Sequence, residues 1–150
     1  MVRRFSLSLI EMALLTGVTL RLYRAVVLSR GPGNWLLFGG SVALGVLLLC
    51  AMATAHLANF TVKRWLWRAP LFAALESACE MLASLLLIWA GREPSGATRA
   101  DWSDWLPMAG DTLLTRELIV CAWALLLAGA VAIVRRTMLH EPVEEENAEA

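Results

Sequence analysis

The sequence has few charged residues for its length, and the two signs balance. Of its 150 residues, 17% are charged, with 13 lysines and arginines against 13 aspartates and glutamates. Soluble proteins carry about 25% charged residues, and a chain without net charge has no overall field that would attract nucleic acid. Because 59% of the residues are hydrophobic and the mean hydropathy is +0.63, the composition excludes ordinary soluble enzyme folds.

Sequence motifs of catalysis are also missing. The chain contains no glycine-rich phosphate loop, no HExxH pattern and no GxSxG pattern, and it has only two histidines. The three cysteines, Cys50, Cys79 and Cys121, have no CxxC spacing, so metal and redox chemistry have no support from the sequence. We therefore expect a protein that is not an enzyme, with no catalytic residues and no metal ligands.

Long uncharged runs dominate the sequence instead. Residues 31–62 and 118–134 contain no formal charge, and a helix needs about 20 mostly apolar residues to cross a bilayer core. Hydropathy predicts four spans, at about residues 5–28, 35–60, 71–90 and 117–134. Residues 63–70 are expected to form a basic hinge, with Pro70 in the first turn of the third helix. The fold class predicted is an all-α integral membrane four-helix bundle.

The bundle is predicted to be a single transmembrane domain over residues 1–140, followed by an acidic tail at 141–150 that is disordered. Four spans place both termini and the middle loop on one side of the membrane. Short clusters of basic residues favour the cytoplasm as that side, in a membrane of the bacterial inner type. These clusters are Arg3 and Arg4, then Lys63, Arg64 and Arg68, then Arg135 and Arg136.

Ionisable residues inside the predicted spans are the main functional candidates. Each costs about 2.5–3.5 kcal/mol at the centre of a membrane helix, so each needs a partner or a role. Glu76 and Glu80 are four residues apart and share one helix face, with Glu80 near the midplane. Glu11 is expected at a comparable depth in the first span. Three carboxylates at similar height can bind a cation or relay protons.

Two simpler interpretations remain open for these carboxylates. Arg21 and Arg24 can pair with them, within this bundle or across a subunit boundary, or the acids can be protonated and hydrogen-bonded to serine or threonine. Because both arginines lie toward the outer end of the first span, they are not expected to reach Glu76 and Glu80. We expect this pair to be buried in protein, with protonation or a neighbouring chain compensating it, and to serve assembly more than transport.

Three further residues are candidate sites. His56, the only histidine in an apolar segment, can ligate a haem iron or a chlorophyll magnesium, but an interfacial hydrogen bond is favoured because no second ligand lies at its depth. Trp102 and Trp105 are three residues apart in the polar loop at 91–116 and predict a short interfacial helix on the outer membrane surface. The alternative role of these two tryptophans is to dock a partner.

Small residues mark two helix faces for close packing. They are Ala124, Ala128 and Ala132 in the fourth span, and Ser41 and Gly45 in the second.

Two main hypotheses of function follow. The first is a small non-catalytic subunit of a larger membrane complex, which stabilises or docks other membrane subunits and lies in the lipid bilayer. The second is a homo-oligomeric channel or carrier in which Glu76 and Glu80 line the route of an ion or proton. A membrane enzyme or electron-transfer subunit that uses His56 is a third hypothesis.

Overall fold

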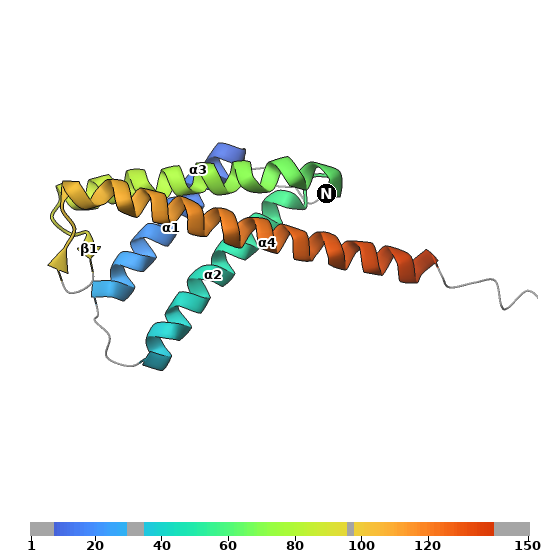
Figure 1. The fold of residues 1–150 in the computed structure, drawn as a ribbon, viewed down its shortest axis with the longest axis horizontal. Coiled ribbons are helices and arrows are strands. Elements are labelled where there is room, and N and C mark those ends of the chain that lie inside the picture. Colours follow the sequence, from blue (N-terminus) through green and yellow to red (C-terminus); the bar gives the residue numbers. More distant parts are fainter. Residues whose placement is uncertain (1–7, 30–34, 96–97, 140–150) are drawn as a thin grey trace, which may run out of the picture.

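Four long helices occupy the four apolar segments of the sequence. The computed structural model describes residues 8–29, 35–95 and 98–139, so the predicted acidic tail lies outside the described residues. Each helix is long and apolar enough to cross a membrane, which confirms the predicted all-α four-helix architecture and fits an integral membrane protein. The helices are α1 (Leu9–Ser29), α2 (Trp35–Leu57), α3 (Val62–Trp89) and α4 (Trp105–Leu139) (Figure 1).

The helices form two crossing pairs. α3 and α4 run antiparallel and side by side, while α1 and α2 cross them obliquely (Figure 1). At 1.5 Å per residue, the 35 residues of α4 span about 52 Å and the 21 residues of α1 about 32 Å. The carboxyl end of α4 consequently extends past the other three helices (Figure 1). The apolar core between the helices includes Leu20, Leu49, Leu57, Phe72 and Val120.

The connection between α2 and α3 lies earlier in the chain than predicted. Residues 58–61 make the turn, and the expected basic hinge at 63–70 is instead the first part of α3, with Pro70 inside that helix. The indole N–H of Trp65 donates to the carbonyl oxygens of Leu57, at 2.9 Å, and Phe60, at 3.1 Å. The Leu57 carbonyl also accepts from the Phe60 N–H at 2.9 Å, so Trp65 ties the first turn of α3 to the end of α2 and to the turn.

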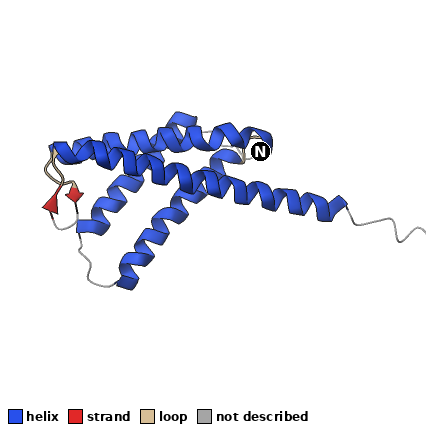
Figure 2. Ribbon diagram, in the orientation of Figure 1, coloured by secondary structure: helices blue, strands red, loops and turns tan. Residues whose placement is uncertain are grey.

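The loop after α3 contains two short strands, β1 (Pro94–Ser95) and β2 (Thr98–Arg99), which pair antiparallel (Figure 2). Gly91, at φ +64°, ends α3 in the left-handed conformation that favours glycine. The N–H of Arg92 donates to the carbonyl oxygen of Leu87 at 2.8 Å, as in a Schellman motif. This reversal directs the loop back toward the bundle.

A short helix does form at the two loop tryptophans, but it is continuous with α4. One 3₁₀ turn, η1 (Trp102–Asp104), leads directly into Trp105, so the fourth helix begins well before residue 117. Trp102 is 61% exposed, whereas the half-buried Trp105 donates its indole N–H to the Met81 carbonyl oxygen at 3.1 Å. Hydropathy did not predict this helical extension, because the residues at the start of α4 include polar ones.

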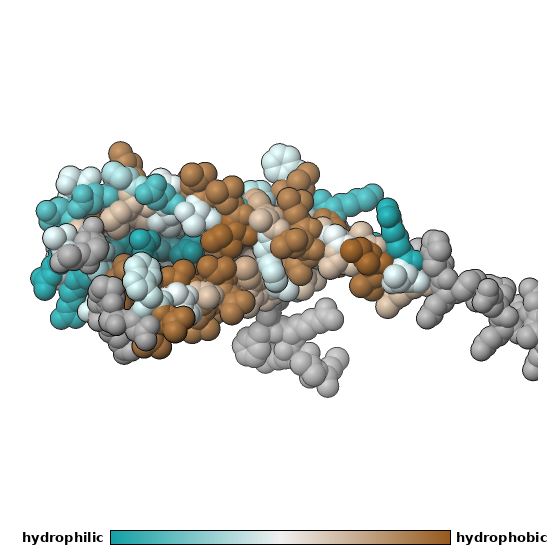
Figure 3. All heavy atoms as spheres, turned by 60° about the horizontal axis from the view of Figure 1, so that its bottom comes forward, coloured by the Kyte–Doolittle hydropathy of each residue, from teal (hydrophilic) through white to brown (hydrophobic). Residues whose placement is uncertain are grey.

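The surface is apolar between two hydrophilic ends. Hydrophilic side chains gather at the end that holds the strands, and again near the carboxyl end of α4 (Figure 3). Exposed leucines are found on every long helix, for example Leu15, Leu44, Leu86 and Leu126. Such a band is the surface expected of a protein that faces lipid acyl chains.

Candidate functional site

Glu76 and Glu80 lie on the face of α3 that is enclosed by the other helices. Both side chains are 0% exposed, and Ser77 and Ser84 are buried on the same side. Their spacing of four residues puts them one above the other on the helix. The expectation that the pair is buried in protein is confirmed.

Two arginines from neighbouring helices reach Glu80. Arg21 of α1 is 1% exposed, and its Nη1 lies 3.6 Å from Oε1 of Glu80. Arg116 of α4 places Nη2 at 2.9 Å and Nε at 3.0 Å from Oε2 of the same carboxylate. One glutamate therefore connects three helices through charge-assisted contacts. The expectation that Arg21 cannot reach this pair was wrong.

Arg21 has two further partners. Its Nη2 donates to Oγ of Ser84 at 2.9 Å, and its Nε donates to Oε2 of Glu93 at 3.3 Å. A second ion-pair contact joins its Nη2 to Oε1 of Glu93. Glu93 comes from the loop after α3 and is buried, because the reversal at Gly91 turns that loop inward.

Sequence reasoning did not find Arg116 or Glu93. Both were assigned to the loop at 91–116, where a charge needs no explanation. A helix that begins at Trp105 places Arg116 three turns inside α4, at the height of Glu80. The distance in sequence from Trp105 to Arg116 indicates this position, but only when the helix is known to begin at Trp105.

A close approach of α1 and α3 brings Arg21 to Glu80. At Gly17, a Cβ atom would lie 2.4 Å from the carbonyl oxygen of Glu76 and 2.7 Å from the backbone nitrogen of Glu80. Ala13, one turn earlier on α1, is fully buried. Ala13 and Gly17 thus form a small-xxx-small pair that lets the two backbones touch. Close packing was predicted only for the small-residue faces of α2 and α4, and this pair was not identified from the sequence.

Glu76 is less well satisfied than Glu80. Its nearest cation is Nε of Arg116, 3.9 Å from Oε1, and neither carboxylate oxygen accepts a hydrogen bond from a described residue. The hydroxyl of Ser77 also has no hydrogen-bond partner in that part of the chain. We call Glu76, Glu80, Arg21 and Arg116 the charge cluster. In it, Glu80 is strongly paired and Glu76 is weakly paired.

Glu11 is not part of this cluster. Because α1 begins at Leu9 rather than near residue 5, Glu11 lies in its first turn and is exposed. The backbone N–H of Ser8 donates to Oε2 of Glu11 at 2.7 Å, and the N–H of Glu11 donates to Oγ of Ser8 at 3.2 Å. This reciprocal pair is a capping box. The expectation that Glu11 lies at the depth of Glu76 and Glu80 was wrong.

His56 is buried among aromatic side chains. Its ring stacks on Phe72, with centroids 5.3 Å apart and an interplanar angle of 16°, and contacts Phe60 at 5.2 Å. Its Nε2 has no hydrogen-bond partner among the described residues. The ring packs as an aromatic side chain between α2 and α3, instead of making the expected interfacial hydrogen bond through this nitrogen.

Within the described ranges, no group of three or more histidine, cysteine, aspartate or glutamate side chains is placed to hold a metal ion. Cys50, Cys79 and Cys121 are free thiols on three different helices. Comparisons with protein-family models, with curated proteins and with solved structures found no match. The described site consists of guanidinium and carboxylate groups whose pairs join α1, α3 and α4.

Proposed function

We propose that this chain is a small non-catalytic integral membrane subunit that stabilises or docks other subunits of a larger membrane complex. The observation that carries the proposal is the carboxyl end of α4, which extends past the bundle (Figure 1). Ala128 of α4 lines the same cavity as Val62 and Lys63, the first residues of α3. Because α3 begins at this level, the part of α4 after Ala128 extends past α3 (Figure 1).

The projecting part of α4 offers a surface for another membrane helix. Ile133 and Met138 are 65% and 73% exposed, and Gly129 and Ala132 are exposed beside them. Small residues let the backbone of a partner helix approach, and van der Waals packing then drives association in lipid. In a docking role, this face binds a helix of another subunit. A bundle that acts alone has no function for it.

The charge cluster supports a structural role over transport. Glu80 is held by Arg21 and Arg116 of the same chain, so its charge is compensated without a bound ion. A carboxylate that must bind and release ions is poorly served by two permanent cationic neighbours, because arginine does not lose its proton in proteins.

The proposal includes an inner membrane of the bacterial type, with both termini in the cytoplasm. Lys63 and Arg64 begin α3, and Arg135 and Arg136 lie near the end of α4. The amino end of α3 and the carboxyl end of α4 lie toward the same end of the molecule (Figure 1). Basic residues at the ends of spans favour the cytoplasmic side.

Purification from native membranes in a mild detergent tests the proposal. We expect unrelated membrane proteins to co-purify in fixed stoichiometry with the wild-type chain, and to be lost from Ala132→Trp, because the indole blocks close approach on the projecting face. Leu114→Trp, at an exposed position elsewhere on α4, is the matched control and should keep the partners. If the chain purifies as a homogeneous oligomer of itself, the subunit proposal is wrong.

One observation favours the second candidate, a homo-oligomeric channel or carrier. Both oxygens of Glu76 are buried without a hydrogen bond from a described residue, and a carboxylate in this state can accept a proton or bind an ion. Proteoliposomes that contain only this chain would then conduct, and Glu76→Gln would abolish the conductance. The subunit proposal instead expects no flux from either protein.

A further inference from the structure

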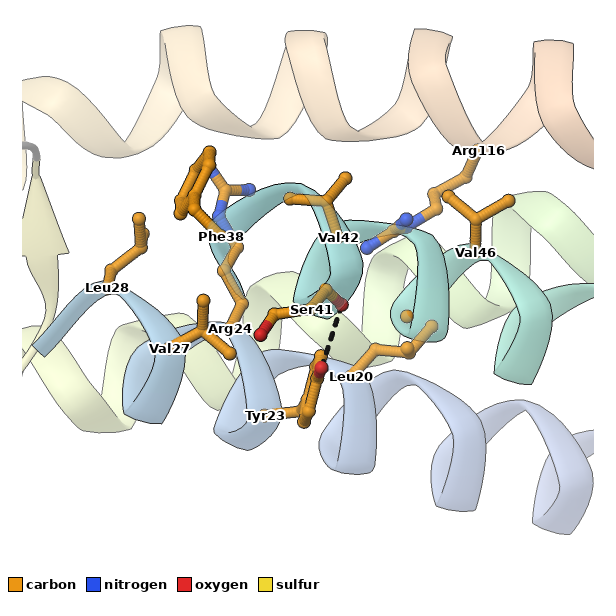
Figure 4. A pocket seen from close by; sticks show the side chains of 11 residues that line it. Leu20, Tyr23, Arg24, Val27, Leu28, Phe38, Ser41, Val42, Val46 and Arg116 are labelled. Atoms are coloured by element: carbon orange, nitrogen blue, oxygen red, sulfur yellow. Dashed lines mark hydrogen bonds between the residues drawn. The ribbon is translucent and has the colours of Figure 1, made fainter. Parts of the chain in front are cut away.

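A groove opens between α1, α2 and α4 on the side of the charge cluster (Figure 4). Its volume is about 310 Å³, and most of its wall is apolar, including Val27, Phe38, Val42 and Val46. The hydroxyl of Tyr23 also lies there, but it donates to the carbonyl oxygen of Ser41 at 2.7 Å. That hydrogen bond joins α1 to α2, so the remaining polar side chains of the groove are Ser41 and two arginines.

Two guanidinium groups, those of Arg24 and Arg116, line the groove from α1 and from α4 (Figure 4). Arg116 is 14% exposed and is paired with Glu80. Arg24, in contrast, has no described carboxylate within 4.0 Å of its guanidinium group. An arginine inside a membrane-spanning helix is costly without a counter-ion.

Other arginines lie closer than Arg24 to the buried acids. Glu80 and Glu93 are bound to Arg21, and the nearest cation to Glu76 is Arg116. Asp111 lines an adjoining cavity of about 280 Å³, together with Arg24 and Arg116, but it does not line the groove itself. The groove is therefore an apolar slot with Arg24, which has no described carboxylate within 4.0 Å, at its wall and Arg116 beside it.

We propose that this groove binds one anionic phospholipid, with its phosphate at Arg24 and an acyl chain along Val42 and Val46. Guanidinium groups bind phosphate oxygens in a bidentate geometry, and an apolar slot in the surface of a membrane bundle is adjacent to lipid chains. A second copy of this chain packed on the same face about a twofold axis would bring Arg24 toward its own equivalent. Charge complementarity therefore favours the lipid.

Native mass spectrometry of the delipidated full chain in detergent measures this binding. The probes are phosphatidylglycerol and phosphatidylcholine with identical acyl chains, and inorganic phosphate alone. We expect one tightly bound phosphatidylglycerol, bound about tenfold more weakly by Arg24→Gln, since one charge-assisted hydrogen bond contributes about this factor. Arg135→Gln, an exposed arginine at the far end of α4, should bind like the wild type.

A second variant tests the slot without changing its charge. Val42→Phe should fill the groove and abolish tight binding, whereas Leu44→Phe, equally exposed on α2 but outside the groove, should not. Equal affinity for the two lipids, or no effect of Arg24→Gln, would overturn the proposal. Binding of inorganic phosphate at the same affinity would overturn it in favour of free phosphate. A dimer that dissociates in Val42→Phe would overturn it in favour of a second copy.

Discussion

Replacing Glu80 by glutamine is expected to destabilise the folded bundle by about 1–3 kcal/mol, the cost of leaving buried charged groups with one hydrogen-bond partner fewer. The glutamine keeps the shape of the side chain but leaves Arg21 and Arg116 without the carboxylate that they share. Both guanidinium groups remain buried or nearly so. The loss should be measurable as a lower midpoint of helix unfolding when the protein in mild detergent is titrated with a denaturing detergent.

Two comparison variants sharpen this prediction. Glu117→Gln makes the same chemical change on α4, where the only described side-chain contact of the carboxylate is the Cys121 thiol at 3.7 Å, and should shift stability by less than about 0.5 kcal/mol. Glu76→Gln should cost less than Glu80→Gln, because Glu76 has one cationic contact at 3.9 Å and no hydrogen bond from a described residue. Equal effects of Glu80→Gln and Glu117→Gln would mean that the ion pairs of Glu80 do not hold the helices together.

The second large effect is expected at Gly17. In Gly17→Ala the new methyl group would overlap backbone atoms of Glu76 and Glu80 on α3, at 2.4 Å and 2.7 Å. Backbone atoms cannot rotate away as a flexible side chain can, so α1 must move outward and draw Arg21 away from Glu80. We expect a loss of at least the roughly 1–3 kcal/mol that is typical of overpacking, in the same unfolding titration.

Gly129→Ala is the matched control for this substitution. It is also a glycine inside a helix, but no atom of a neighbouring helix lies within 4 Å of the position that its new methyl group would take. Alanine favours helix by about 0.5–1 kcal/mol over glycine, so this variant should be neutral or slightly more stable. If Gly17→Ala behaves in the same way, the two helices do not touch as closely as described.

The parts of the fold that follow from local properties could be predicted from the sequence. Four apolar segments of sufficient length define four membrane helices, and a spacing of four residues places Glu76 and Glu80 on one face. Burial of that face follows from the cost of exposing carboxylates to lipid. None of these steps requires knowledge of how the helices pack.

The partners of the carboxylates could not be predicted, because they depend on helix boundaries and on packing between helices. Arg116 became a candidate partner only once α4 was known to begin at Trp105. Arg21 reaches Glu80 because Gly17 permits a backbone contact, and no property of either helix alone defines that contact.

Glu11 is a different kind of error, since its role was visible in the sequence. Ser8 and Glu11 have the S-x-x-E spacing of a capping box before an apolar run. That motif defines the start of α1 and places Glu11 at the end of the helix. A hydropathy average over many residues cannot detect this motif, because the motif depends on the identity and spacing of two residues that hydrogen-bond to each other.

Glu80 and Arg116 form an ion pair within one chain, and the stability of the bundle is expected to depend on it. A double-mutant cycle measures this dependence directly, from the unfolding free energies of the wild type, Glu80→Gln, Arg116→Gln and the double variant. We expect a coupling of about 1–3 kcal/mol, with the double variant more stable than the sum of the single losses predicts. Additivity within about 0.5 kcal/mol would contradict a stabilising pair between Glu80 and Arg116.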